Sequence, residues 1–191
     1  MTKGRLEAFS DGVIAIIITI MVLELKVPHS AEWSALHELI PIFMSYVLSF
    51  VYVAVYWGNH HHLLHTVKNV SAGIIWSNAA LLFFLSLIPF ATAWMGENHF
   101  AQNTVIAYSI LMNLCGMSYY VLMYMIMQCH SENAELTAAL NTQRRKGILS
   151  LFLYSFSIGA AFINPMISQV IFVLVAIMWF IPDKNIKRLM R

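Results

Sequence analysis

Six stretches of this 191-residue sequence are long and almost continuously apolar, and shorter polar segments separate them. Crossing about 30 Å of hydrocarbon takes roughly 20 apolar residues in an α-helix. A helix satisfies its own backbone groups in lipid, whereas barrel strands would alternate apolar and polar positions. The pattern therefore predicts an all-α membrane protein, one domain over residues 1–191, with spans at 6–27, 36–60, 71–95, 101–128, 147–163 and 165–181.

Two prolines mark interruptions in this pattern. Pro89 lies inside the third predicted span and predicts a kink there, because proline removes a helical hydrogen bond. Only Asn164 and Pro165 separate the last two predicted spans. The residue before a proline is disfavoured in a helix, which favours a tight turn between two helices over one long kinked helix.

The basic residues alternate between the two sides of the predicted membrane. With the N-terminus in the cytoplasm, only Lys26 of the 11 Lys and Arg residues lies on the outer side. This bias is the one that cytoplasmic segments show, so both termini are predicted to be cytoplasmic. It also favours two separate helices in 147–181, because a single helix would place the basic C-terminus outside.

Composition agrees with a membrane protein and limits the function classes. The chain is 60% hydrophobic and 10% charged, with a mean hydropathy of +0.71, far from a soluble domain. Its basic residues follow the topology and form no patch interleaved with aromatic residues, so membrane lipids rather than nucleic acid are expected as surroundings. No nucleophile and base lie together in the sequence, so no enzyme is predicted.

The first helix is too short to face lipid along its whole length. Only 12 uncharged residues lie between Asp11 and Glu24, so its ends need shelter by protein or water. Within it, Ile16, Ile20 and Leu23 form one stripe at helical spacing. Periodicity alone leaves two interpretations open, an ordinary packing seam or a pore lining with a hydrophobic constriction.

The residues before this stripe carry a resemblance. Arg5, Phe9, Ser10 and Asp11 stand in the spacing Arg-x-x-x-Phe-Ser-Asp, which resembles the signature of the transmembrane protein 175 family of potassium channels. Six spans in about 190 residues are similar to its single-repeat bacterial members. The resemblance implies a potassium-permeable cation channel in the bacterial plasma membrane. It further implies a homotetramer whose first helices surround the ion path, with no carbonyl filter loop and no cofactor besides the permeant K⁺.

The same resemblance assigns roles along the first helix. The narrowest point in family members is an aliphatic residue five positions after the motif aspartate, which corresponds to Ile16. Further constricting rings correspond to Ile20 and Leu23. A hydroxyl eight positions after the aspartate, linked in some members to potassium preference, corresponds to Thr19.

The polar motif needs partners from another helix. Arg5 and Asp11 are six residues apart, which places them about 240° apart around a helix axis, so Arg5 is a poor partner for Asp11. We expect Ser10 and Asp11 to bond instead to groups at the same depth and to lock the first helix in place. The candidates on the second and third spans are Trp57, Asn59, His60, His61 and Asn78.

A cluster of histidines ends the second span. It comprises His60, His61, His62 and His65. No nearby Glu or Cys completes a metal site, so a hydrogen-bonded structural cluster is favoured over metal binding, and proton sensing is a further option. The alternative function is accordingly a proton pathway or a secondary transporter that uses Asp11 and this cluster.

Overall fold

The computed structural model describes residues 1–129 and 134–180, with the side chains of 134–139 left out. The predicted cytoplasmic C-terminus and the last residue of the sixth predicted span lie outside the described residues. Within them every regular element is a helix, as predicted. The helices are α1 (Lys3–Leu23), η1 (Trp33–Leu36, a 3₁₀-helix), α2 (Ile40–His65), α3 (Ala72–Ser86), α4 (Ile88–Glu97), α5 (Gln102–Cys129), α6 (Ala134–Ile163) and α7 (Pro165–Phe180).

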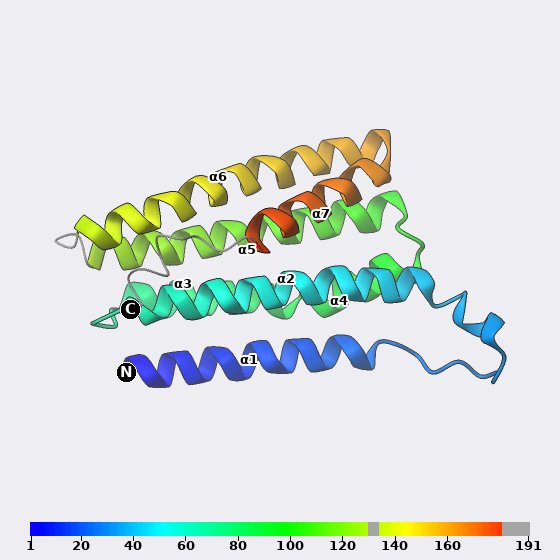
Figure 1. The fold of residues 1–191 in the computed structure, drawn as a ribbon, viewed down its shortest axis with the longest axis horizontal. Coiled ribbons are helices and arrows are strands. Elements are labelled where there is room, and N and C mark those ends of the chain that lie inside the picture. Colours follow the sequence, from blue (N-terminus) through cyan, green and yellow to red (C-terminus); the bar gives the residue numbers. More distant parts are fainter. Residues whose placement is uncertain (130–133, 181–191) are drawn as a thin grey trace.

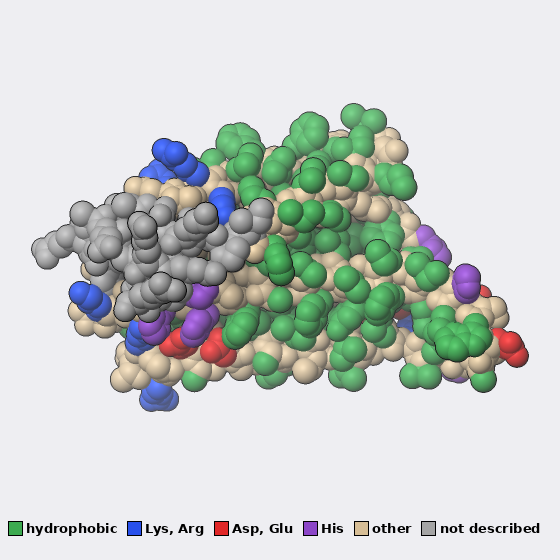
Figure 2. Space-filling view, viewed as in Figure 1, with side chains coloured by type: hydrophobic (Ala, Val, Ile, Leu, Met, Phe, Trp, Pro, Cys, Tyr) green, Lys and Arg blue, Asp and Glu red, His purple; other side chains and the backbone are tan. Residues whose placement is uncertain are grey.

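The long helices lie side by side along the long axis of the molecule (Figure 1). Five apolar units in the described ranges are long enough to cross a membrane, namely α1, α2, α3 with α4, α5 and α6. The sixth, α7, is apolar but has only 16 residues, a length of about 24 Å at 1.5 Å per residue. The apolar side chains cover the middle of the molecule, and Lys and Arg gather at the end where α1 begins (Figure 2).

Prolines explain where two helices begin. The third predicted span is divided at Leu87, because Pro89 occupies the first turn of α4 and donates no backbone hydrogen bond there. Between α6 and α7 only Asn164 intervenes, and its Oδ1 accepts a hydrogen bond from the Met166 amide at 2.9 Å. The chain therefore reverses direction at this point, and α7 packs back along α6.

Several predicted boundaries were wrong. The first helix ends at Leu23 rather than residue 27, since Val27 precedes Pro28 and such residues disfavour the helix. The second begins at Ile40 and extends to His65. The largest error is α6, which begins at Ala134 rather than residue 147. Its polar first half is rich in helix-forming residues that hydropathy does not detect.

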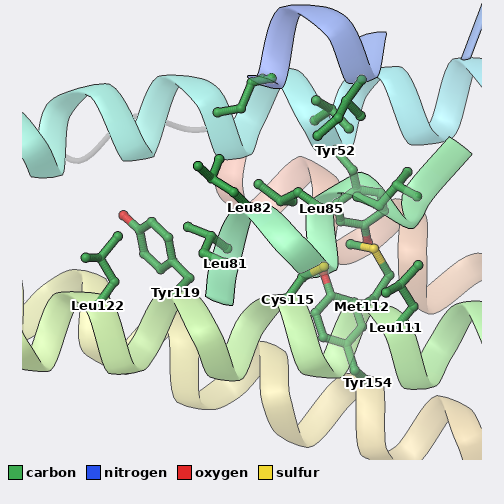
Figure 3. Packing of buried hydrophobic residues seen from close by; sticks show 14 of the residues in the cluster. Tyr52, Leu81, Leu82, Leu85, Leu111, Met112, Cys115, Tyr119, Leu122 and Tyr154 are labelled. Atoms are coloured by element: carbon green, nitrogen blue, oxygen red, sulfur yellow. The ribbon is translucent and has the colours of Figure 1, made fainter. Parts of the chain in front are cut away.

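The buried core lies around α5. This helix packs against α3 on one side and α6 on the other. Leu81 and Leu85 of α3 and Met112 of α5 belong to this core, and Tyr52 and Tyr154 enter it from α2 and α6 (Figure 3). By contrast, α1 lies at the edge of the molecule, with its main contacts to α2, α3 and α4. Its other side is left without intramolecular packing.

Candidate functional site on the first helix

The first helix has two faces of different character. The buried face carries residues spaced by three and four, and it packs against α2, α3 and α4. Its members are Leu6, Ser10, Ile14, Ile17 and Met21. On the opposite face the stripe is exposed, with Ile16 at 59%, Ile20 at 41% and Leu23 at 78%. The stripe is therefore not a packing seam within this chain.

Thr19 lies on the exposed face beside this stripe. Its hydroxyl donates to the Ile16 carbonyl at 2.8 Å. A threonine hydroxyl has two acceptor lone pairs. Those lone pairs are the only strong acceptors that a side chain contributes to this face between Gly12 and Leu23.

Asp11 is held by α2. Its Oδ1 accepts a hydrogen bond from Trp57 Nε1 at 3.0 Å, and the carboxylate is half-buried. The indole is a donor only, so it satisfies the ionised carboxylate without adding a charge. This contact connects the motif aspartate to the second helix.

A buried chain of hydrogen bonds lies next to this contact. Asn78 Nδ2 donates to Ser10 Oγ at 2.9 Å, and His60 Nε2 lies 2.6 Å from Asn78 Oδ1. The Ser10 hydroxyl donates in turn to the Leu6 carbonyl at 2.8 Å. Because all three side chains are at most 1% exposed, loss of any one would leave a buried polar group unsatisfied.

Other predicted network residues lie elsewhere. Asn59 turns away from α1, and its Oδ1 accepts from Gln143 Nε2 of α6 at 3.3 Å. His61 contacts Glu7 instead of the motif pair, with Nδ1 2.9 Å from Glu7 Oε1. Phe9 is 61% exposed. Arg5 is exposed and has no hydrogen bond or ion pair within the described part of the chain.

The sequence analysis did not identify two residues of α1, Lys3 and Glu7, that contact α2. Besides the Glu7 carboxylate, Lys3 Nζ donates to the His65 carbonyl at 2.6 Å. A signal was present, since Lys3, Glu7 and Asp11 are spaced by four, as are the three α2 residues they meet. Antiparallel helices can pair two such series turn by turn.

The histidines do not assemble a metal centre in the described ranges. His61 stacks between Trp57 and His65, with ring centroids 6.2 and 6.1 Å away. His60 belongs to the buried chain described above. No three His, Cys, Asp or Glu side chains gather as metal ligands in residues 1–129 and 134–180.

The fold and this helix define a class of protein. Several apolar helices are long enough to cross a membrane, and the first of them is held by polar groups on one face and exposed on the other. That architecture is typical of helical membrane channels, in which apolar pore linings can control ion passage.

Comparison with known proteins agrees with this class. The family described as the endosomal/lysosomal potassium channel TMEM175 matches residues 5–89. A potassium channel of Chryseobacterium sp. (strain P1-3) is 50% identical over 188 residues, which cover 98% of this chain and 97% of the relative. The chain therefore belongs to the TMEM175 family. It is an ion-channel protein rather than an enzyme, and a multi-pass protein of the bacterial plasma membrane.

A solved structure and a vertebrate relative extend the comparison. The crystal structure of a lysosomal potassium-selective channel TMEM175 homolog from Chamaesiphon minutus is similar with a TM-score of 0.83 and 27% identity. The similarity covers 95% of this chain and 98% of that one. The human endosomal/lysosomal proton channel TMEM175 is 32% identical over 103 residues, which are 48% of this chain and 20% of that protein.

Proposed function

We propose that this chain is the subunit of a potassium-permeable cation channel whose ion path is lined by α1 of several copies. The observation that carries the proposal is the exposed stripe of Ile16, Ile20 and Leu23 opposite the anchored face of α1. The names of the bacterial relatives support potassium as the permeant ion. No resident cofactor is needed for this function.

The proposal includes a homotetramer. A single α1 cannot enclose an ion path, so its exposed face requires copies of itself around an axis. Four copies are the number that the family resemblance implies. The polar contacts at Ser10 and Asp11 support this arrangement, because they leave α1 little freedom to rotate and so aim the stripe in one direction.

Ion passage in this proposal depends on a hydrophobic constriction. Four Ile16 side chains that meet at the axis would strip water from an ion and close the path by dewetting. Ile20 and Leu23 form further apolar rings in the same path. The Thr19 hydroxyl offers oxygen acceptors within it and contributes to the preference for potassium.

Flux in liposomes tests this proposal. The full chain is purified, reconstituted and given a potassium gradient, with a sodium gradient and empty liposomes as controls. We expect potassium flux above sodium flux, and an increase of about tenfold in Ile16→Asn, because a polar ring no longer excludes water. Ile177→Asn is the matched control, since Ile177 is an exposed aliphatic residue on α7 and its replacement should leave flux unchanged.

The outcomes separate the parts of the proposal. Equal flux in Ile16→Asn and wild type would mean that the constriction does not lie at Ile16. Absence of flux in both folded proteins would overturn the channel function.

A proton pathway is the second candidate. The name of the human relative favours it, as do Asp11 and the histidines beside it. A pH-sensitive dye enclosed in the same liposomes distinguishes the two. Proton flux without potassium flux would favour this candidate.

A further inference from the structure

Three contacts join the first turns of α1 to the last turns of α2. Lys3 reaches the His65 carbonyl at 2.6 Å, Glu7 meets His61 at 2.9 Å, and Asp11 accepts from Trp57 at 3.0 Å. Both series advance four residues at a time, so each contact lies one turn from the next. The middle contact differs from the others because the charge of its imidazole depends on pH.

His61 is accessible to water. Its side chain is 43% exposed, and that of Glu7 is 21% exposed, so protons reach the pair from water. The Glu7 carboxylate is its direct ionic partner among the described residues. The charged or titratable groups that contacts place around His61 are Glu7, Asp11 and Lys3 on α1, and His60, His62 and His65 on α2.

The position of Glu7 on α1 connects this pair to the exposed stripe. Glu7 and Ile16 are nine residues apart, which places them about 180° apart around the helix axis. A stronger attraction between Glu7 and α2 therefore pulls α1 in the direction opposite to the one in which Ile16 points.

We propose that Glu7 and His61 are further positioning residues of this channel, and that protonation of His61 strengthens their contact, draws α1 onto α2 and increases conduction. This inference rests on the proposed function, in which Ile16 lines the ion path. At high pH the neutral imidazole keeps a hydrogen bond to Glu7 but loses the ionic attraction. The constriction at Ile16 is then narrower.

The test is potassium flux at pH 8 and pH 5.5, with equal pH on both faces of the liposome. We expect wild-type flux to rise about three- to fivefold at the lower pH, the factor that a partly exposed ion pair supplies. Glu7→Gln and His61→Gln should each abolish the rise. The exchange Glu7→His with His61→Glu rebuilds the pair and should restore it, which a merely structural role would not predict.

Matched controls use the same substitutions elsewhere. His29 and Glu32 are exposed residues of the segment between α1 and α2, at the far end of α1 from Glu7. His29→Gln and Glu32→Gln should keep the full rise. A wild type without the rise, or a rise that survives in both Glu7→Gln and His61→Gln, would overturn the proposal.

Melting temperature gives a readout that needs no conduction. The gap in melting temperature between wild type and Glu7→Gln should widen as pH falls from 8 to 5.5, since the ion pair is charged only when His61 is protonated. Normal flux with a constant gap would overturn this inference alone. Absence of flux with a widening gap would overturn the channel function and retain the proton-dependent contact.

Discussion

Asn78 is the residue at which three helices meet through hydrogen bonds. Located on α3, it donates to Ser10 of α1 and accepts from His60 of α2. Its amide orientation is determined by these partners, because the Ser10 hydroxyl proton is already directed to the Leu6 carbonyl. A flipped amide would place the Asn78 carbonyl oxygen against the lone pairs of the Ser10 hydroxyl. One side chain therefore fixes both the depth and the rotation of α1.

Replacement of Asn78 should be costly. We expect Asn78→Leu to destabilise the protein by about 2 to 4 kcal/mol, because a buried imidazole and a buried hydroxyl each lose a partner. The melting temperature of the purified protein measures the effect. Ser77→Ala is the matched control, since the Ser77 hydroxyl bonds only to carbonyls of its own helix, and its melting temperature should change little. Equal effects of the two substitutions would contradict the role assigned to Asn78.

At the scale of elements, α2 and α4 approach each other closely at Gly96. A Cβ atom added there would lie 2.4 Å from Ser45 Oγ and 2.8 Å from Ile42 Cα. The second of these atoms belongs to the backbone, so a rotamer change cannot relieve the clash. The absence of a side chain at Gly96 thus allows the two helices to pack at this distance.

Gly96→Ala should separate these helices. We expect a destabilisation of about 1 to 3 kcal/mol, the range for overpacking a close contact. Gly159→Ala is the control, because a Cβ at Gly159 meets nothing within 4 Å. Unfolding of both variants is compared by melting temperature and by retention as folded protein after purification. A melting temperature of Gly96→Ala equal to that of Gly159→Ala would contradict the close approach.

The segment after α1 is tied to α4 by a charged pair. Lys26 Nζ lies 2.6 Å from Glu97 Oε1. The hydrogen bond that Lys26 donates to this carboxylate raises the pKa of Lys26 above its ordinary value. Lys26 therefore stays charged at neutral pH, and its contribution to the pair is lost as pH rises above the ordinary range of a lysine. Because both groups are exposed, the pair orients the segment more than it stabilises the fold.

The sequence predicted the helices that are continuously apolar. It did not predict a helical segment made of polar residues. The predicted span of α5 agrees with the helix to within one residue, and that of α7 agrees at its first residue. The first half of α6 was missed because its polar residues carry no hydropathy signal. The contacts of the motif were also predicted only in part. Trp57 and Asn78 were expected near the motif from their depth alone, but depth does not say which way a side chain turns. Asn59 accordingly faces α6 although its neighbour His60 faces α3.

At the scale of the whole molecule, one face of α1 packs against α2, α3 and α4, and its other face is exposed. Lipid is an adequate environment for exposed aliphatic side chains, but it is a poor one for Asp11 and Glu7 on the same helix. Those carboxylates are held by Trp57 and His61 of α2, and copies of the chain around a common axis would bring the exposed faces together. The contacts of the carboxylates hold one face of α1 against α2, and the exposed stripe favours assembly through the other face.

Cysteine cross-linking tests that assembly directly. In a Cys129→Ser background, which removes the exposed native thiol and leaves the buried Cys115, Ile16→Cys should form disulfide-linked dimers of the membrane-embedded chain on mild oxidation. In the proposed tetramer four Ile16 positions would lie near one another around a narrow constriction, so linkage should be efficient and reversed by reductant. Phe156→Cys is the control, because Phe156 is 64% exposed but lies on α6. Dimers from Phe156→Cys in place of Ile16→Cys would mean that α6, rather than α1, faces the neighbouring subunit, and the ion path would have to be sought beside it.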